Sequence, residues 1–410
     1  MGPLAGIRVL DLSRILAGPW ATQILADLGA EVIKVERPGV GDDTRRWGPP
    51  WLTDAQGAAS AESAYYLSAN RGKRSVTIDF TQAAGADLVR QLAGQSQILV
   101  ENYKVGALAR YGLDYASLIG LNPALVYCSI TGFGQTGPYA ERAGYDAAIQ
   151  AQGGLMSITG EPDGSPGGGP QKVGVAVSDL MTGMYAVVGI LAALRHSEAT
   201  GQGQQIDLAL LDTQVGWLAN QAMNYLVGGE LPQRHGTAHP NIVPYQVMPS
   251  ADGSFMLSVG NDAQFRKLCA AIGAPELADD PRHASNAARV VHRASLIDIL
   301  GQALRQRPAA DWLREFEALG IPCAPVQTLD QVFADQQVQA RGMRFELPHA
   351  SGVEVPMVAN PLKFSETAVE YDRAPPLLGA DTRAVLREHL GLDEAALDRL
   401  AASGVIDSTA

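Results

Sequence analysis

Asp179 stands at the junction between a strand-like segment and a long apolar segment. The strand-like run extends from Lys172 to Val177, and a nearly all-apolar stretch from Leu180 to Leu194 follows the aspartate. An aspartate placed just before a helix commonly caps it by accepting hydrogen bonds from the first backbone N–H groups. The same position would keep the carboxylate ionised through the helix dipole and would offer N–H groups to a developing oxyanion, which suits covalent catalysis. The residues alone leave cap and nucleophile as alternatives.

A glycine pattern, GFGQTG at Gly132 to Gly137, has the GxGxxG form of a dinucleotide-binding loop and follows the strand-like run Leu125 to Ile130. Its context does not fit that role, because Pro138 and polar residues follow the last glycine where an apolar helix is needed. We therefore interpret the pattern as a turn or a substrate-facing loop, and NAD is not predicted as a cofactor.

His235 and His239 have the i, i+4 spacing of two metal ligands on one helix face. Gly236 and Pro240 disfavour a regular helix there, so a polar loop that lines a pocket is favoured and no metal is predicted. The chain also lacks the GxSxG, Walker A and HExxH motifs. It therefore lacks the residues that define serine hydrolases, P-loop NTPases and zincins, and these classes are not predicted.

The composition is that of a globular protein without a nucleic-acid or membrane partner. The chain has 410 residues, of which 46% are hydrophobic, and a net charge of −12, which disfavours a polyphosphate partner. The longest apolar run, Ala186 to Leu194, is too short for a membrane span. The N-terminus lacks the basic-then-apolar order of a signal peptide. Three separated cysteines, Cys128, Cys269 and Cys323, fit a reducing cytoplasm.

Alternating strand-like and helical segments predict an α/β fold with a parallel sheet covered by helices on both faces. The first βαβ unit combines the runs Ile7 to Leu12 and Val32 to Val35 with the helical pattern Ala21 to Leu28. Further strand-like runs lie at Ser75 to Phe80, Ile98 to Val100, Leu125 to Ile130 and Ile206 to Leu211. Shorter, mixed elements predict a smaller domain over residues 223–327, after a larger N-terminal part and linker over residues 1–222.

Eight blocks, in order along the chain, cover nearly all of it from Leu4 to Gly379. They read LAGIRVLDLSRILAGPWATQILADLGAEVIKVERPGVGDDTR, NRGKRSVTIDF, ENYKVGALARYGLDY, YCSITGFGQTGPYAERAGYD, SDLMTGMYAVVGILAAL, TGQGQQIDLALLD, GIPCAPV and RAPPLLG. Together they resemble the class III CoA-transferases, the relatives of formyl-CoA transferase and carnitine CoA-transferase. The resemblance implies a Rossmann-like large domain, to which residues 328–410 return through a linker, a smaller α+β domain, and an interlocked, ring-shaped homodimer.

The family's D-x-x-T-G-M segment corresponds to Asp179-Leu-Met-Thr182-Gly183-Met184, and it implies that Asp179 is the catalytic nucleophile. The resemblance also implies that coenzyme A, as a substrate thioester, is held by Leu16, Ala17, Arg37, Ile78, Asp79, Phe80, Thr81, Asn102, Tyr103, Lys104, Arg110, Ala143, Gly144, Tyr145 and Asp146. Arg37 and Arg110 suit the phosphates of CoA, because a guanidinium binds phosphate oxygens well.

One departure from formyl-CoA transferase concerns the acceptor acid. That enzyme carries a glycine-rich loop from its small domain, whereas this chain has HGTAHPNIVPYQ at His235 to Gln246, so oxalate or formate specificity is not expected. The string GTAHPNIVPYQ, with WGPP near Trp47, resembles instead the succinyl-CoA:glutarate subgroup, which implies short dicarboxylate substrates. Candidates for binding the far carboxylate are Arg14, Arg45, Arg46, His235 and His239.

The mechanism implied by the resemblance is attack of Asp179 on an acyl-CoA thioester, with an aspartyl mixed anhydride as intermediate and no need for ATP. An acyl-CoA racemase of the same fold is an alternative, but racemases carry a catalytic histidine in the region of Cys128 to Gly132, and this chain has none there. A non-catalytic CoA-binding protein is a second alternative, which requires the carboxylate of Asp179 to be dispensable.

Overall fold

The computed structural model describes residues 2–54 and 56–407, and the chain divides into two compact units. The first unit comprises Met1–Gly154, Val173–Ala222 and Gln337–Ala410, and the second comprises Leu155–Lys172 and Met223–Gln336. The second unit therefore contains the predicted segment 223–327 but also takes the glycine-rich residues 155–172 from the middle of the first. The first unit contains both ends of the chain.

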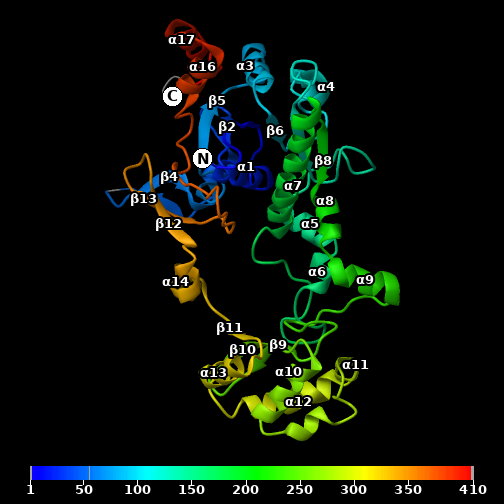
Figure 1. Cartoon of the computed structure of the whole chain (residues 1–410). Coiled ribbons are helices and arrows are strands. Elements are labelled where there is room, and N and C mark those ends of the chain that lie inside the picture. Colours follow the sequence, from blue (N-terminus) through cyan, green and yellow to red (C-terminus); the bar gives the residue numbers. More distant parts are fainter. Residues whose placement is uncertain (1, 55, 408–410) are drawn as a thin grey trace. The chain divides into compact units, whose positions relative to one another are not determined.

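The first unit is built on a sheet of six parallel strands, as the alternating pattern predicted (Figure 1). In spatial order the strands are β5 (Lys73–Thr77), β2 (Glu31–Glu36), β1 (Arg8–Asp11), β6 (Ile98–Glu101), β7 (Val126–Thr131) and β8 (Gln205–Ala209). The four residues of β6 and the six of β7 are all buried, which is the burial expected of parallel strands covered on both faces.

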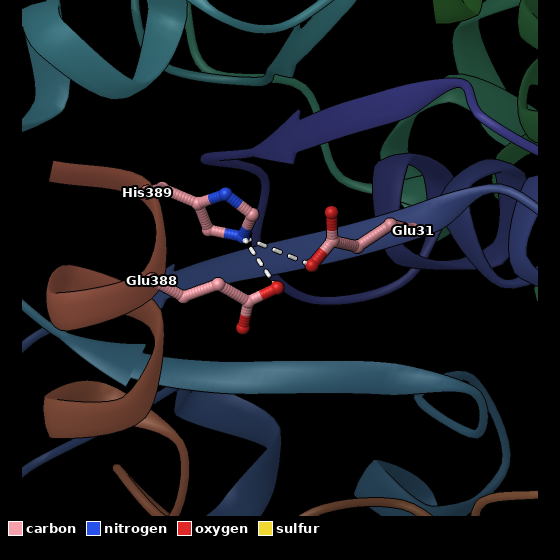
Figure 2. A group of neighbouring side chains, drawn as sticks. All are labelled: Glu31, Glu388 and His389. Atoms are coloured by element: carbon pink, nitrogen blue, oxygen red, sulfur yellow. Dashed lines mark hydrogen bonds and ion pairs between the residues drawn. The ribbon is translucent and has the colours of Figure 1, made fainter.

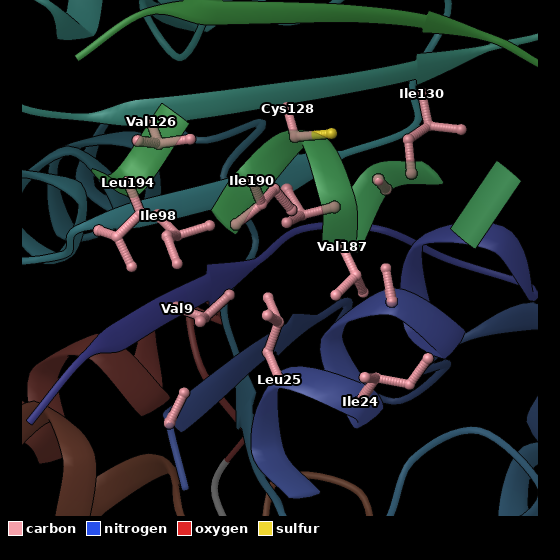
Figure 3. Packing of buried hydrophobic residues seen from close by; sticks show 14 of the residues in the cluster. Val9, Ile24, Leu25, Ile98, Val126, Cys128, Ile130, Val187, Ile190 and Leu194 are labelled. Carbon is pink, nitrogen blue, oxygen red and sulfur yellow. The ribbon is translucent and has the colours of Figure 1, made fainter. Parts of the chain in front are cut away.

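Two apolar cores cover the two faces of this sheet, because alternate side chains of each strand point to opposite faces. Val9, Ile98 and Val126 pack with α1 (Ala17–Asp27) and α7 (Val177–Thr200), as Figure 3 shows around Leu25, Val187 and Ile190. The neighbouring residues Leu10, Leu99 and Tyr127 face the other core, which contains α3 (Ala83–Gly94), α4 (Tyr115–Leu118), α16 (Thr382–Leu390) and α17 (Glu394–Ala402).

The long helix α7 is apolar on nearly all sides. With a mean hydropathy of 1.7, it is long and apolar enough, by length and composition alone, to cross a membrane. Its inward side packs in the core against α1 and β7, which accounts for the apolar residues on that side. Its other side leaves Met184, Tyr185 and Val188 exposed in the single chain.

The second unit contains an antiparallel three-stranded sheet with helices packed around it. The strands are ordered β11 (Cys323–Pro325), β10 (Ser254–Ser258) and β9 (Tyr245–Pro249). The helices that share a core with this sheet are α10 (Asp262–Ala271), α11 (Asn286–Val291), α12 (Arg293–Leu304) and α13 (Ala309–Leu319). The unit also contains α6 (Leu155–Ile158) and α14 (Leu329–Ala334). Phe255, Phe265, Trp312 and Phe316 form the centre of a separate apolar core.

Smaller elements complete the chain. They are β3 (Trp51–Thr53), β4 (Ala59–Ser63), α2 (Ala64–Leu67), α5 (Asp146–Gln152), α8 (Leu210–Gly216), α9 (Ala219–Gly228), α15 (Gln336–Ala340), β12 (Arg344–Pro348) and β13 (Glu354–Val358), with 3₁₀ turns at Asp43–Arg46, Ala109–Tyr111 and Pro275–Ala278. Strands β3 and β4 pair with each other, as do β12 and β13.

Glu31, Glu388 and His389 meet at the edge of the first unit, where α16 approaches β2 (Figure 2). His389 Nε2 lies 3.1 Å from Glu31 Oε1, in a grouping that resembles a metal-ligand set. Arg74 Nη1, however, lies 2.7 Å from Glu31 Oε1 and 2.9 Å from Glu388 Oε2, and Arg8 also pairs with Glu31. Both carboxylates are thus neutralised by guanidinium groups, so we interpret the cluster as an ion-pair network that fastens α16 to the sheet.

A network of buried charged side chains fixes the loop that follows β1. Lys34 Nζ lies 2.9 Å from Asp42 Oδ2 and donates to the Ser13 carbonyl, with both charged side chains fully buried. Asp42 also accepts the N–H of Ile15, whose φ of 72° is a strained conformation for a β-branched residue. Asn102 accepts the Arg14 N–H and donates to the Arg14 carbonyl. Three side chains from different elements therefore hold this loop in one conformation.

Glu101, the last residue of β6, is buried without a cationic partner among the described residues. It accepts the Tyr103 N–H at 2.8 Å, and burial raises the pKa of its carboxyl to about 7. A raised folded-state pKa means that stability falls as pH rises from the ordinary value of 4.5 towards 7. We expect Glu101→Gln to increase the free energy of unfolding by about 1–3 kcal/mol at pH 8 and to leave it nearly unchanged at pH 4.

Urea unfolding of both proteins at the two pH values measures this difference. The exposed residue Glu198 offers a matched control, since Glu198→Gln should leave stability unchanged at either pH. An equal effect of Glu101→Gln at pH 4 and pH 8 would show that Glu101 does not titrate as proposed.

Candidate active site

Asp179 is the third residue of α7 and lies inside its first turn. The residue before the helix is Ala176, which offers no side-chain cap. The capping carboxylate is instead Asp146, whose Oδ1 accepts the N–H of Ser178 at 2.8 Å and that of Asp179 at 3.3 Å. Of the two alternatives, the cap does not apply to Asp179, because the helix begins at Val177 and a carboxylate from the start of α5 already occupies the capping position.

The ionisation of Asp179 also differs from the expectation. Burial, and secondly the negative charge of Asp146, raises the pKa of the Asp179 carboxyl to about 7. The helix start therefore does not hold this carboxylate in its ionised form. No described residue donates a hydrogen bond to the Asp179 carboxylate, so its oxygens are available to a ligand. A desolvated carboxylate with a raised pKa is a stronger base and a stronger nucleophile than one in water.

Asp179 lines a cavity of about 370 Å³ at the carboxyl ends of the parallel strands. The sheet order changes direction between β1 and β6, where the following chain segments diverge and open α/β sheets bind their ligands. The cavity is formed by the loops after β1, β6 and β7, the segment before α5, and α7, and its wall includes Arg14, Ile15, Leu16, Ala17, Asn102, Tyr103, Lys104, Arg110, Ile130, Thr131, Gly132, Arg142, Ala143, Gly144, Tyr145, Asp179 and Leu210.

A second cavity of about 360 Å³ lies beside the first along the same edge of the sheet. The two cavities share Arg14, Tyr103, Ala107 and Arg110 as wall residues, so they adjoin. The wall of the second cavity also includes Arg37, Asp42, Asp43, Ile78, Asp79, Phe80, Thr81 and Tyr111. Together the cavities form an elongated site with Asp179 in one part and Arg37 in the other, which suits a long ligand.

The structure brings the predicted CoA-binding residues together in these two cavities. Leu16, Ala17, Asn102, Tyr103, Lys104, Arg110, Ala143, Gly144 and Tyr145 line the first cavity with Asp179. Arg37, Ile78, Asp79, Phe80 and Thr81 line the second, together with Tyr103 and Arg110. Asp146 lines neither cavity and acts instead on the backbone of α7.

The residues predicted to bind a far carboxylate are dispersed. Arg14 lines both cavities, where its Nη1 pairs with Asp43 Oδ2 at 2.9 Å. Arg46 is exposed and lines neither of these cavities. His235 and His239 belong to the second unit, where burial and then the charge of Arg293 lower the pKa of both imidazoles.

Arg45 does not fit the predicted substrate role, because it is buried and fully engaged by internal partners. Its side chain is 6% exposed, and its guanidinium lies 2.8 Å from Glu36 Oε2 and 3.2 Å from Glu62 Oε2. It also donates to the Tyr66 hydroxyl and to the Pro376 carbonyl. This arginine therefore fastens the 3₁₀ turn at Asp43–Arg46 to the sheet.

Two residues at the site were not predicted from the sequence. Arg142 lines the first cavity, where its guanidinium stacks over the rings of Tyr139 and Phe133, and it has no carboxylate partner within the described residues. The second residue is Tyr65, on α2. Burial, and then the negative charges of Asp179 and Asp146, raise the pKa of its phenol to about 12. No motif or spacing marks either residue in the sequence.

The GFGQTG segment has a packing role at the cavity wall. A Cβ on Gly132 would lie 2.6 Å from the Gly144 Cα, so the backbones of the two segments touch and neither position tolerates a side chain. The N–H of Gln135 donates to Asp207 on β8, which fixes the far end of the loop. The glycines thus bring the Ala143–Asp146 segment close to β7.

Comparisons with known proteins agree with this geometry. A model of the family described as CoA-transferase family III matches residues 4–382. The chain is 52% identical over 386 residues to the succinate–glutarate CoA-transferase of Agrobacterium fabrum, covering 94% of this chain and 95% of that one. It is 44% identical over 407 residues to the succinyl-CoA:glutarate CoA-transferase of Mus musculus, covering 99% and 91%. A solved CAIB/BAIF family protein from Brucella suis has 49% identity and a TM-score of 0.82, covering 95% and 99%.

Proposed function

We propose a specific reaction for this chain on the premise that it belongs to CoA-transferase family III. The reaction is transfer of CoA from succinyl-CoA to a short dicarboxylate, with glutarate as the preferred acceptor. Relatives from two distant organisms that carry this activity in their names are 52% and 44% identical to the chain over nearly its full length. The observation that supports the chemistry is a partly buried, unpaired carboxylate, Asp179, in a cavity whose other charged wall residues are cations.

The two adjoining cavities suggest how a CoA thioester is oriented. CoA carries several phosphate charges at one end and its sulfur at the other, and a chain with a net charge of −12 needs local cations to hold it. Arg37 in the second cavity and Arg110 between the cavities supply guanidinium groups for the phosphates. The thioester then lies in the first cavity beside Asp179.

The proposed reaction begins with attack of an Asp179 oxygen on the thioester carbonyl carbon. The carbon–sulfur bond breaks, CoA leaves as the thiolate, and a mixed anhydride joins Asp179 to the succinyl group. A glutarate carboxylate next attacks the aspartyl carbonyl carbon and displaces succinate. The thiolate finally attacks the glutaryl carbonyl carbon, which gives glutaryl-CoA and restores the Asp179 carboxylate. The partial burial of Asp179 limits the access of water, which would hydrolyse the anhydride.

Acceptor specificity is tested by comparing glutarate with valerate, which has the same number of carbon atoms but lacks the far carboxylate. We expect kcat/KM for glutarate to exceed that for valerate by about 10²-fold or more, because valerate leaves a cationic site unpaired. The assay follows new thioesters by mass spectrometry after addition of succinyl-CoA, with oxalate, itaconate, citramalate, hydroxymethylglutarate and carnitine as further acceptors. Equal rates with valerate and glutarate would refute a dicarboxylate site.

The pH dependence of the reaction follows from the ionisation of Asp179. Only the ionised carboxylate is a nucleophile, so kcat/KM should fall about tenfold per pH unit below the Asp179 pKa of about 7. Asp146→Asn removes a negative charge while its amide oxygen still accepts the two N–H groups of α7. We therefore expect this variant to move the acidic limb to lower pH. A limb that moves to higher pH, or does not move, would contradict this electrostatic coupling.

The exposed outer side of α7 supports assembly with a second copy of the chain. Val188 is 61% exposed, and Met184 and Tyr185 beside it, with Val215 and Trp217 at the neighbouring α8, extend this apolar surface. Apolar surfaces of this kind mark protein interfaces. We expect a homodimer by sedimentation velocity and a shift towards monomer in Val188→Asp, whereas a monomeric wild-type protein would exclude the assembly.

A further inference from the structure

Three polar side chains hold the segment that leads into α7 and its first turn. Asp146 accepts the N–H groups of Ser178 and Asp179, and Gln214 accepts the Ser178 hydroxyl at 2.7 Å. The third side chain is Gln150, on α5, which contacts the other oxygen of the Asp146 carboxylate. All these residues belong to the first unit, and of them only Asp179 lines the cavity.

Gln150 has both ends of its amide engaged. Its Nε2 donates to Asp146 Oδ2 at 2.7 Å, and its Oε1 accepts the N–H of Val173 at 3.0 Å. The side chain is 0% exposed, and it stands one turn after Asp146 on the same helix. The glutamine amide carries both a donor group for the carboxylate and an acceptor oxygen for the backbone.

The contacts of Asp146 explain why the position of Gln150 matters. Asp146 Oδ1 is occupied by two backbone donors of α7, and Oδ2 receives the Gln150 amide. No cation pairs with Asp146 among the described residues, so Gln150 fixes this carboxylate without cancelling its charge. The Asp146 carboxylate is thereby held at a constant place relative to Asp179.

We propose that Gln150 is a positioning residue for the nucleophile. By holding Asp146 Oδ2 and the Val173 amide at once, it fixes the first turn of α7 and the direction in which the Asp179 carboxylate faces the cavity. The inference rests on the proposed function, because it assigns Gln150 a role in the reaction of Asp179. Nothing in its residue type distinguishes Gln150 in the sequence from the exposed Gln152, two positions later on the same helix.

The charges around Asp179 make the pH dependence of kcat a test of the role of Gln150, because a residue with only a structural role would not shift it. The ionisable group that acts on Asp179 is Asp146 from α5. Tyr65 from α2 lies in the field of Asp179 itself, and the same cavity contains Arg14, Lys104, Arg110 and Arg142. In Gln150→Glu, a carboxylate oxygen replaces the amide donor that faces Asp146 Oδ2, so this hydrogen bond is lost. The substitution also adds negative charge near Asp179. We expect this variant to move the acidic limb of kcat towards higher pH by roughly one unit.

The first experiment compares Gln150→Met with the matched control Gln152→Met in the full-length protein. We expect Gln150→Met to lower kcat by about 10- to 100-fold, because small displacements of a nucleophile have effects of that size, with the KM for succinyl-CoA changed less than about threefold. The control should retain the wild-type kcat. A wild-type kcat in Gln150→Met would overturn the proposal. If that variant does not fold, the pH profile of Gln150→Glu decides, and an unmoved limb overturns the proposal.

The second experiment is a double-mutant cycle that restores the hydrogen bond between positions 146 and 150 with donor and acceptor exchanged. In D146N/Q150E the new amide at position 146 can accept the α7 N–H groups and donate to the new carboxylate at position 150. We expect this double variant to recover at least about tenfold in kcat over Q150E alone, a coupling that independent sites do not show. Additive losses would refute the proposal. These outcomes are separable from failure of the proposed function, which would appear as absence of CoA transfer by the wild-type protein.

Discussion

Asp179→Asn is expected to lower kcat for glutaryl-CoA formation by roughly 10⁴-fold, since loss of a catalytic nucleophile has effects of at least this size. The amide is nearly isosteric with the carboxylate but cannot form the mixed anhydride. A KM is not measurable at such low rates, so the Kd for CoA is measured separately by titration. We expect the Kd for CoA to change less than about threefold, because Asp179 lies in a different part of the elongated site from Arg37.

The same variant should be more stable than the wild type at neutral and alkaline pH. Burial and Asp146 raise the pKa of Asp179 from 3.8 to about 7 in the folded state. The unfolded chain therefore loses its proton first, and the stability of the wild type falls as pH rises through this window. We expect a gain of about 1–3 kcal/mol for Asp179→Asn at pH 8 and almost none at pH 3. An inactive but destabilised variant would point to misfolding as the cause of the lost activity.

Arg45→Met is expected to have the largest effect on stability. Among the described residues Arg45 is the only cation within ion-pair distance of Glu62 and of Glu36, so its removal leaves two buried carboxylates without an ion-pair partner. Breaking a buried ion pair from one side destabilises a protein by about 3–5 kcal/mol. Urea unfolding monitored by circular dichroism measures the loss, and the fraction that remains folded should retain the wild-type KM for glutarate.

Arg46→Met is the matched control for that prediction. Arg46 is the next residue in the chain and is exposed, so its replacement should change the free energy of unfolding by less than about 0.5 kcal/mol. If Arg45→Met instead remains as stable as Arg46→Met and raises the KM for glutarate, Arg45 binds substrate as the sequence suggested.

The elements with strong patterns were predicted well from the sequence. Strands such as Ile98–Glu101 and Val126–Thr131 are short apolar runs, and their alternation with helices indicated the parallel sheet. The α/β fold and the CoA-transferase family are confirmed. The resemblance also proposed residues for CoA binding that lie in two adjoining cavities. The interlocked homodimer and the cytoplasmic location stay predictions.

The errors concern contacts between residues far apart in the chain. Asp146 and Asp179 both precede apolar segments, and only the packing of α5 against α7 decides which carboxylate caps the helix. Arg45 and Arg46 are identical neighbours, and the 3₁₀ turn directs one towards Glu36 and the other to solvent. Arg142 lies in a segment without hydrophobic periodicity, so local pattern does not place it in the cavity. Local sequence does not encode such pairings.

The most direct test of covalent transfer through Asp179 uses glutarate labelled with ¹⁸O in its carboxylates. In each turnover the aspartyl carboxylate loses one oxygen to succinate and gains one from glutarate. After many turnovers with succinyl-CoA, proteolysis and mass spectrometry should find ¹⁸O in the peptide that contains Asp179, and no label should enter in Asp179→Asn. Formation of glutaryl-CoA without ¹⁸O in that peptide would contradict the account, because CoA would then move without passing through this carboxylate.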